Sequence, residues 1–163
     1  MNAVDENDPA IRDTIAVYTS LLEAWNRRDA AAYAALFTAD GHATGFDGSQ
    51  MNGRDEIATE LGAIFAHHPT ASYVARVRDV RLLAPGVTLL RAAVGMVPPG
   101  ANALNPAVNA IQSVICVSDD EGDYRIAFFQ NTPAAFHGRP ELVQALTDEL
   151  THVLQSGKTV ATR

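Results

Sequence analysis

The sequence predicts a single α+β domain in which helices come first and an antiparallel sheet follows. In the first 68 residues the apolar side chains recur every three or four positions, which is the period of a helix. After Pro69 the pattern changes, and long extended runs alternate with turn signals. Helices and strands grouped in this way, without alternating βαβ units, are typical of α+β folds. A chain of 163 residues suits one domain with one core.

The first helix is expected to begin at Asp8-Pro9, because aspartate is a preferred N-cap and proline favours the first helical position. Asp29 can cap a second, short helix over residues 30–37. The first helix carries one apolar face, whose members recur at spacings of three or four: Ile11, Ile15, Tyr18, Leu22 and Trp25.

A hairpin is expected between the second and third helices. Residues 38–41 have the composition of a turn, and residues 42–46 that of a short strand. Asp47-Gly48 is a strong hairpin signal, after which residues 49–52 return. The third helix then runs until Pro69 ends it, since proline cannot continue a helix.

Four long strands in an antiparallel meander make up the second half. The alternation of the first strand slips between Val77 and Val80, which predicts a bulge or bend. The strands are expected at residues 72–83, 87–97, 107–118 and 124–132.

An additional helix can begin at Pro140, because leucines follow it at every fourth position: Leu142, Leu146, Leu150 and Leu154. We expect disorder at residues 1–8 and 156–163. A long curved sheet with three helices on one face forms an open cone. Such a cone is a natural pocket for a small molecule.

The charge of the chain argues against some partners. Its 12 basic and 19 acidic residues give a net charge of −7. A nucleic-acid binder needs a basic surface, and an anionic membrane repels an acidic protein, so neither partner is expected. Seven of the acidic residues lie in residues 1–8 and 119–123, and the remaining acids equal the bases in number. The pocket of such a protein suits an uncharged ligand.

The sequence contains no signal for a membrane span or for export. No apolar stretch approaches 18 residues, and the polar, acidic N-terminus lacks the basic start and apolar run of a secretory signal. We therefore expect a cytoplasmic protein.

No cofactor or metal is expected. Cys116 is the only cysteine, which excludes a disulfide within the chain, and its apolar neighbours predict a buried, inert thiol. The five histidines do not have the spacing of a metal site. No glycine-rich fingerprint for a dinucleotide is present.

Four segments carry a resemblance to a known superfamily: AWNRRD at residues 24–29, LFTADG at 36–41, GRDEI at 53–57 and YRIAFFQNT at 124–132. In this order they resemble the NTF2-like superfamily, which includes ketosteroid isomerases and SnoaL-type polyketide cyclases. The last segment resembles the SgcJ/EcaC group, whose members recur in bacterial natural-product clusters, including enediyne clusters.

The resemblance implies an NTF2-like domain over residues 9–134, with residues 135–163 forming a C-terminal helix and tail. It implies a homodimer packed through the sheet and a hydrophobic small-molecule ligand. It does not imply one reaction, because a single fold hosts many chemistries.

Candidate acid–base residues are few. Aligning the family segment places Phe46 where an isomerase carries its carboxylate base, which argues against isomerase activity of that kind. Dehydratase-like members use a His–Asp dyad, for which His67, His68 and Asp40 are the candidates here. The alternative for the histidines is structural, because a histidine at a helix C-terminus interacts favourably with the helix dipole.

Amides and aromatic residues are the expected lining of the pocket. Gln112, Gln130 or Asn131 could donate a hydrogen bond to a carbonyl or enolate oxygen. Neighbouring strand residues face opposite sides, so at most one of Gln130 and Asn131 points inward. Trp25, Phe46 and Tyr73 are the aromatic candidates for ligand binding. The alternative for Trp25 is core packing, and the alternative for Tyr73 is a position that caps the sheet.

Two functions therefore remain open from the sequence. One is a small-molecule-binding protein of natural-product biosynthesis that acts as a cofactor-free cyclase, isomerase or dehydratase by proton transfer. The other is a non-catalytic module for ligand binding or dimerisation. A protein–protein adaptor would have a filled core without a cavity.

Overall fold

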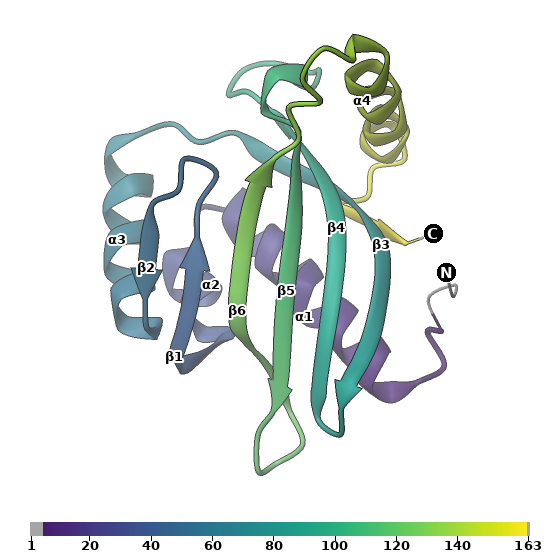
Figure 1. The fold of residues 1–163 in the computed structure, drawn as a ribbon. Helices are drawn as coiled ribbons and strands as arrows, with labels where there is room; N and C mark the ends of the chain where they lie inside the picture. The colour runs from purple at the N-terminus through teal and green to yellow at the C-terminus, as the bar shows by residue number, and fades with distance from the viewer. Residues whose placement is uncertain (1–4, 163) are drawn as a thin grey trace.

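The computed structural model describes residues 5–162 and contains four α-helices, one 3₁₀ helix and seven strands within that range. Figure 1 shows the sheet with α1 running behind it. In chain order the elements are α1 (Pro9–Asn26), α2 (Ala30–Ala35), β1 (Phe37–Thr44), β2 (Gln50–Asn52), α3 (Arg54–His67), β3 (Ser72–Ala84), β4 (Val87–Val97), η1 (Pro106–Val108), β5 (Ala110–Ser118), β6 (Tyr124–Pro133), α4 (Pro140–Gln155) and β7 (Val160–Thr162).

The predicted α+β cone is confirmed, and the expected meander of long strands, β3 to β6, is antiparallel. Two parallel pairings outside the meander make the sheet as a whole mixed. Its strand order is β2-β1-β6-β5-β4-β3-β7. β1 runs parallel to β6, and β7 runs parallel to β3, while the other pairs are antiparallel. The partners of each parallel pair are far apart in the chain, with residues 45–123 between β1 and β6 and residues 85–159 between β3 and β7. Such separation permits parallel pairing, whereas a tight hairpin can join only antiparallel strands.

Residues 38–41 lie within β1, so the predicted turn there is wrong, and α2 ends at Ala35, two residues before its expected end. The strand is irregular at this point, because its register with β6 shifts between Phe37 and His42. A Cβ on Gly41 would lie 2.8 Å from the Ile126 carbonyl oxygen. The small, turn-like residues therefore permit a close backbone approach inside a strand.

The hairpin and the bulge are confirmed. Thr44 pairs with Gln50 across the Asp47-Gly48 turn, where Gly48 has φ 89°. The register between β3 and β4 shifts between Val77 and Asp79. β5 begins at Ala110, later than expected, because residues 106–108 form a 3₁₀ turn after the N-cap Asn105.

The prediction of disorder at residues 156–163 is wrong for residues 156–162. Ser156 closes α4 by donating hydrogen bonds to the helix carbonyls, and β7 then pairs with β3 through a bond from the Ala75 N–H to the Thr159 carbonyl at 2.8 Å. At the other end, residues 5–8 form a turn before α1. The predictions for residues 1–4 and 163 lie outside the described residues.

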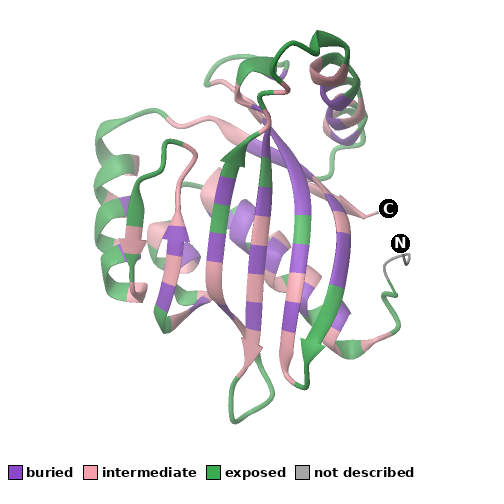
Figure 2. Ribbon diagram, in the orientation of Figure 1, coloured by how far each residue is buried: buried purple, intermediate pink, exposed green. Residues whose placement is uncertain are grey.

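The helices α1, α2 and α3 cover one side of the sheet and enclose the main core (Figure 2). The buried face of α1 contains Ile11, Tyr18 and Leu22, as its spacing predicts. No helix in the described part of the chain is both long and apolar enough to cross a membrane.

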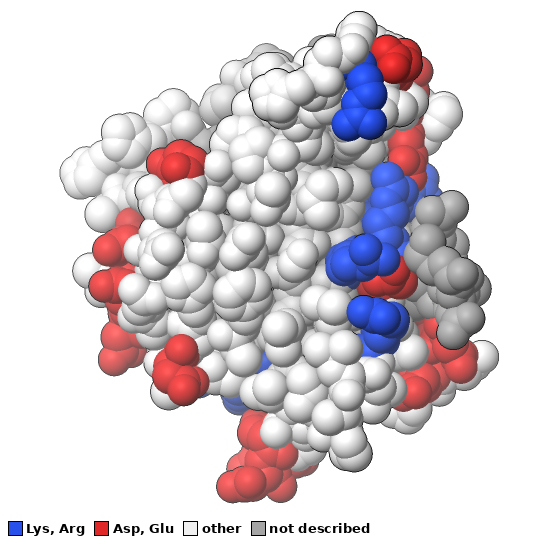
Figure 3. All heavy atoms as spheres, viewed as in Figure 1, with Lys and Arg blue, Asp and Glu red and all other residues white. Residues whose placement is uncertain are grey.

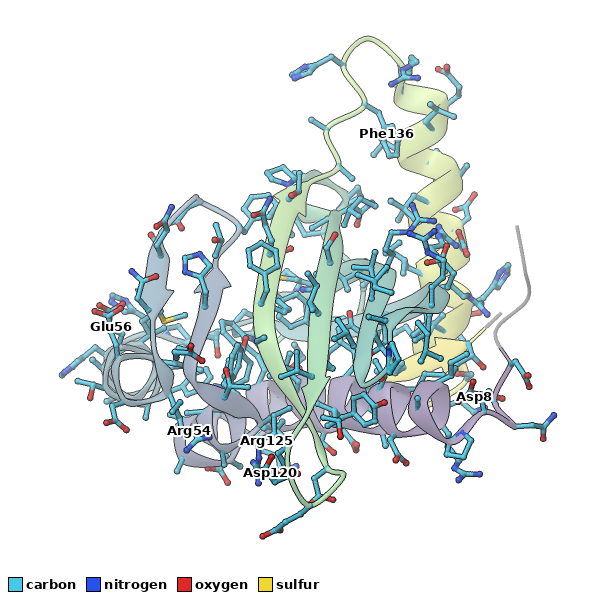
Figure 4. All side chains as sticks on the ribbon, turned by 60° about the horizontal axis from the view of Figure 1, so that its bottom comes forward. Asp8, Arg54, Glu56, Asp120, Arg125 and Phe136 are labelled. Carbon is cyan, nitrogen blue, oxygen red and sulfur yellow. The ribbon has the colours of Figure 1, made fainter. Side chains whose placement is uncertain are left out.

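Two arginines close the junction between α2 and β1. The Arg54 guanidinium donates two hydrogen bonds to the Phe37 carbonyl, at 2.9 and 2.7 Å, and Arg125 donates one to the Ala35 carbonyl at 2.8 Å. Figure 4 labels both side chains at the same end of the molecule, with Asp120 on the turn between β5 and β6. Arg125 thus satisfies a carbonyl at the C-terminal end of α2, and Arg54 satisfies the first carbonyl of β1.

The other side of the sheet is only partly covered. α4 packs on β3 and β4, where Leu146 and Leu150 contact a small apolar cluster around Val74 and Ala93. Arg76 and Arg78 lie on the same face of β3, and both pair with Glu149 on α4. Figure 3 shows that the rest of this side is mostly free of Lys, Arg, Asp and Glu, with the basic residues gathered along one margin.

Candidate functional site

A cavity of about 290 Å³ lies between the three N-terminal helices and the inner side of the sheet. Side chains from the helices, from the hairpin of β1 and β2, and from β3, β4 and β6 all border it. Most of the lining is apolar. The lining residues are Trp25, Tyr33, Ala43, Thr44, Gly45, Phe46, Asp47, Ser49, Met51, Glu60, Leu61, Ile64, Tyr73, Met96, Phe129 and Asn131.

Trp25 is the centre of the aromatic part of the lining. Its ring lies 5.2 Å from Phe65 in an edge arrangement, 5.4 Å from Tyr73 and 6.1 Å from Tyr33, measured between centroids. Its indole N–H donates to the Ala71 carbonyl at 2.9 Å. Edge and tilted contacts of this kind are favourable, and the hydrogen bond fixes the ring against the cavity.

Asn26, the last residue of α1, holds the first part of β3 in place. Its Oδ1 accepts a hydrogen bond from the Tyr73 N–H at 2.8 Å, and its Nδ2 donates to the Tyr73 carbonyl at 3.0 Å. The amide thus takes the position of a neighbouring strand. The next N–H on this edge, that of Ala75, pairs with the segment leading into β7. Asn26 therefore sets the position of Tyr73 in the cavity.

Tyr73 and Asn131 form a buried polar pair within the otherwise apolar wall. Asn131 Nδ2 donates to the Tyr73 hydroxyl oxygen at 3.1 Å. The Oδ1 of Asn131 is buried and has no hydrogen-bond partner among the described residues. Burial raises the pKa of Tyr73 to about 12, so its phenol is neutral at pH 7.

The rim of the cavity is acidic. Asp47, Ser49 and Glu60 line the cavity and are exposed to solvent. The Ser49 N–H donates to Asp47 Oδ1 at 2.9 Å, and hydrogen bonding to Ser49 lowers the pKa of Asp47. A carboxyl group with a lowered pKa stays ionised and is a weak general base. Asp47 is thus better suited to repelling anions than to abstracting a proton.

Gln112 lies directly opposite Asn131 in the register between β5 and β6, but it does not line the cavity. It is fully buried and accepts a hydrogen bond from the Tyr18 hydroxyl at 2.6 Å. Its Nε2 has no partner among the described residues. Desolvation raises the pKa of Tyr18 well above 10, so this pair carries no charge.

The three candidate acid–base residues do not line the cavity. His67 ends α3 and His68 caps it, and both border a shallow, open depression with Arg28 and Phe65. Asp40 is exposed on β1, where its Oδ1 accepts a hydrogen bond from the Thr38 hydroxyl at 3.1 Å. The structure therefore does not bring the histidines and Asp40 together with the aromatic lining.

The remaining candidates fall into two groups. Trp25, Phe46, Tyr73 and Asn131 meet in the cavity, whereas Gln130 is exposed, on the opposite side of the sheet from its neighbour Asn131. Cys116 is buried, as expected, and burial raises the pKa of its thiol to about 12. Within residues 5–162, no group of three or more His, Cys, Asp or Glu side chains could hold a metal ion.

Comparison with known families agrees with this geometry. The model of the SnoaL-like domain family matches residues 18–102, more than half of the chain. The chain belongs to this family. The matched segment contributes Trp25, Phe46 and Tyr73 to the cavity, while Asn131 lies beyond it. A search of curated proteins found no match.

Solved structures share the fold of this SnoaL-like protein. A domain of unknown function with a cystatin-like fold from Nostoc punctiforme has a TM-score of 0.72 and 21% identity, covering 89% of this chain and 94% of its own. A ketosteroid isomerase-like protein from Erwinia carotovora atroseptica has a TM-score of 0.62 and 18% identity, and the match covers 78% of this chain and 98% of that protein. ActVI-ORFA from Streptomyces coelicolor has a TM-score of 0.62 and 16% identity, and the match covers 76% of this chain and 96% of that protein.

Sequence reasoning missed Asn26 and Glu60. Asn26 appears in the sequence only as part of the segment AWNRRD, because no sequence pattern shows that its amide meets a strand 47 residues later. A signal for Glu60 was present: it lies four residues before Ile64, and both lie on the cavity side of α3. The shared helix face could have placed Glu60 beside the pocket.

Replacement of Asn26 by aspartate tests its role in the site. The Asn26→Asp variant keeps an acceptor for the Tyr73 N–H but places a carboxylate oxygen against the Tyr73 carbonyl. We expect the free energy of unfolding to fall by about 2 kcal/mol, measured by urea denaturation. The control is Asn7→Asp, which adds the same charge at an exposed position. Equal stability of the two variants would contradict the role assigned to Asn26.

Proposed function

We propose that this SnoaL-like protein binds an uncharged, mainly apolar small molecule in its cavity. The observation that carries the proposal is the cavity itself: about 290 Å³ of space with a largely aromatic and aliphatic wall and one buried polar pair. Ligand sites are typically concave, mostly apolar and supplied with a few polar groups. An adaptor that only bound other proteins would have no need of such a space.

The class of ligand that we propose is a polyketide-derived natural product. The support is the family: SnoaL-type polyketide cyclases share this fold, and the closing strand over residues 124–132 resembles the SgcJ/EcaC group of natural-product clusters, including enediyne clusters. We place the protein in the cytoplasm, as its sequence predicts, as an accessory or tailoring protein of biosynthesis.

A cofactor-free cyclase, isomerase or dehydratase is the second candidate function. The Tyr73 and Asn131 pair favours it, because neutral donors in a dry pocket can stabilise a developing oxyanion. Proton transfer would then require His67, His68 or Asp40, the candidates from the sequence. None of the three lines the cavity, which favours binding over catalysis.

A homodimer through the open side of the sheet belongs to the same proposal. That side is mostly free of formal charge (Figure 3), and its exposed residues include Ile111 and Gln130. Apolar and neutral polar residues are typical of the cores of homodimer interfaces. α4 covers only the part of the sheet formed by β3 and β4, which leaves β5 and β6 available.

Blocking the cavity mouth tests ligand binding. Ile64 lines the mouth and is 38% exposed, so Ile64→Trp should narrow the entrance without disturbing the core. We expect titration with prodan, an uncharged naphthalene fluorophore, to give saturable blue-shifted emission with the unmodified protein and at least about fivefold weaker binding with the variant. Leu82→Trp, at an exposed site outside the cavity lining, is the control. Unchanged affinity in Ile64→Trp would refute this site.

Simultaneous replacement of His67, His68 and Asp40 by alanine separates binding from catalysis. Because none of the three lines the cavity, we expect prodan affinity to stay within about twofold of the original. Turnover of any ligand that the protein retains from its producing host, followed by mass spectrometry, should be lost if these residues move the proton. Turnover that survives all three changes would show that the acid–base assignment is incorrect.

The dimer is tested by a charge on the open side of the sheet. We expect Ile111→Glu to convert a dimer into a monomer in size-exclusion chromatography with light scattering, since burying an unpaired carboxylate is unfavourable. Ile64→Glu is a matched control, because Ile64 and Ile111 are 38% and 37% exposed. If both variants keep twice the mass of one chain, the interface lies elsewhere.

A further inference from the structure

In the buried side-chain amide of Asn131, one polar atom makes a hydrogen bond and the other makes none with the described residues. The side chain is 6% exposed and lines the cavity. Its Nδ2 donates to the Tyr73 hydroxyl oxygen at 3.1 Å, whereas its Oδ1 has no partner among the described residues. A buried carbonyl oxygen without a hydrogen bond is unfavourable, and such atoms in proteins are normally satisfied by a protein group, a water molecule or a ligand.

The Tyr73 hydroxyl has an unused hydrogen-bond donor, which complements the unused acceptor of Asn131. Its oxygen accepts the bond from Asn131, and its own hydrogen donates to no residue in the described range. Tyr73 is 7% exposed and lines the same cavity. The pair therefore offers the cavity one donor, the Tyr73 O–H, and one acceptor, the Asn131 Oδ1.

We propose that the cavity selects an uncharged ligand that bears a hydroxyl group and inserts this group against Tyr73 and Asn131. The inference rests on the proposed binding function and names the class of its ligand. A hydroxyl oxygen can accept the Tyr73 proton while its own proton goes to Asn131 Oδ1. The three groups then form a closed ring of hydrogen bonds: Asn131 Nδ2 to Tyr73, Tyr73 to the ligand, and the ligand to Asn131 Oδ1.

Other oxygen groups satisfy only half of this arrangement. A ketone accepts from Tyr73 but has no proton for Asn131 Oδ1, which would stay buried without a partner. A carboxylate has the same deficiency, and it must also pass the exposed carboxylates Asp47 and Glu60 at the rim. The site thus favours alcohols, phenols and enols over their oxidised or ionised counterparts, because each unmet group costs binding free energy.

The experiment compares three probes with the same carbon skeleton: 2-decalol, 2-decalone and decalin-2-carboxylate. The protein contains a single tryptophan, and Trp25 lines the cavity, so its fluorescence reports binding without a label. We expect 2-decalol to bind at least about tenfold more tightly than 2-decalone, with the carboxylate weakest.

Two variants tie this preference to the pair. Asn131→Leu removes the acceptor and keeps the size of the side chain, and Tyr73→Phe removes the donor. In Asn131→Leu, the preference for 2-decalol should fall to about twofold or less, while binding of 2-decalone changes little. In Tyr73→Phe, both probes lose the same donor, so both should bind more weakly. Gln130→Leu is the matched control, because it removes an amide on the opposite, exposed side of the same strand and should keep the preference.

The outcomes distinguish this inference from the function on which it rests. Binding of 2-decalol and 2-decalone with equal affinity, or tighter binding of the ketone, would overturn the hydroxyl preference and leave the ligand cavity in place. Absence of binding by all three probes would overturn both. A preference that persists in Asn131→Leu would show that other groups select the hydroxyl. Circular dichroism of each variant confirms that it is folded.

Discussion

The attachment of the C-terminal end of α1 to the beginning of β3 is the interaction on which the site depends. Asn26 bonds both backbone groups of Tyr73, Trp25 bonds the Ala71 carbonyl, and Arg28 bonds the Thr70 carbonyl at 2.8 Å. An edge strand otherwise presents unpaired backbone groups to solvent. Here side chains satisfy them, and the same contacts hold the aromatic rings of Trp25 and Tyr73 at the wall of the cavity.

The cavity combines an apolar wall with very few polar groups, and this contrast gives each polar group a strong effect. In a dry environment a satisfied hydrogen bond is strengthened, and an unsatisfied one is costly. Gln112 and Asn131 lie opposite each other on β5 and β6, and they bond to Tyr18 of α1 and Tyr73 of β3, respectively. Each amide keeps one atom without a partner among the described residues. Only the second pair lines the cavity, so only it can be completed by a ligand.

The two sides of the sheet have different roles. The inner side carries the core and the cavity, whereas the outer side carries α4, a salt-bridged arginine pair and a neutral surface. The excess of acidic residues behind the net charge of −7 lies mostly away from both sides of the sheet. Part of the excess acid lies before α1 and part on the turn between β5 and β6, where Figure 4 places Asp120. Charge at these positions favours solubility and leaves the site neutral except for its rim.

The sequence by itself determined the elements and the general nature of the fold. Periodicity, caps and turn residues act over a few positions, so α1, the Asp47-Gly48 hairpin, β4 and the bulge near Val77 followed from local rules. Strand alternation also determined that Gln130 and Asn131 face opposite sides.

The tertiary structure alone decided which candidate residues come together. Three contacts join residues that are far apart in the chain: the parallel pairing of β1 with β6, the pairing of β7 with β3, and the Asn26 contact with Tyr73. The same long-range packing leaves His67 and Asp40 outside the cavity lining. Such contacts depend on loop closure and packing of the whole chain, for which a single sequence carries no local pattern.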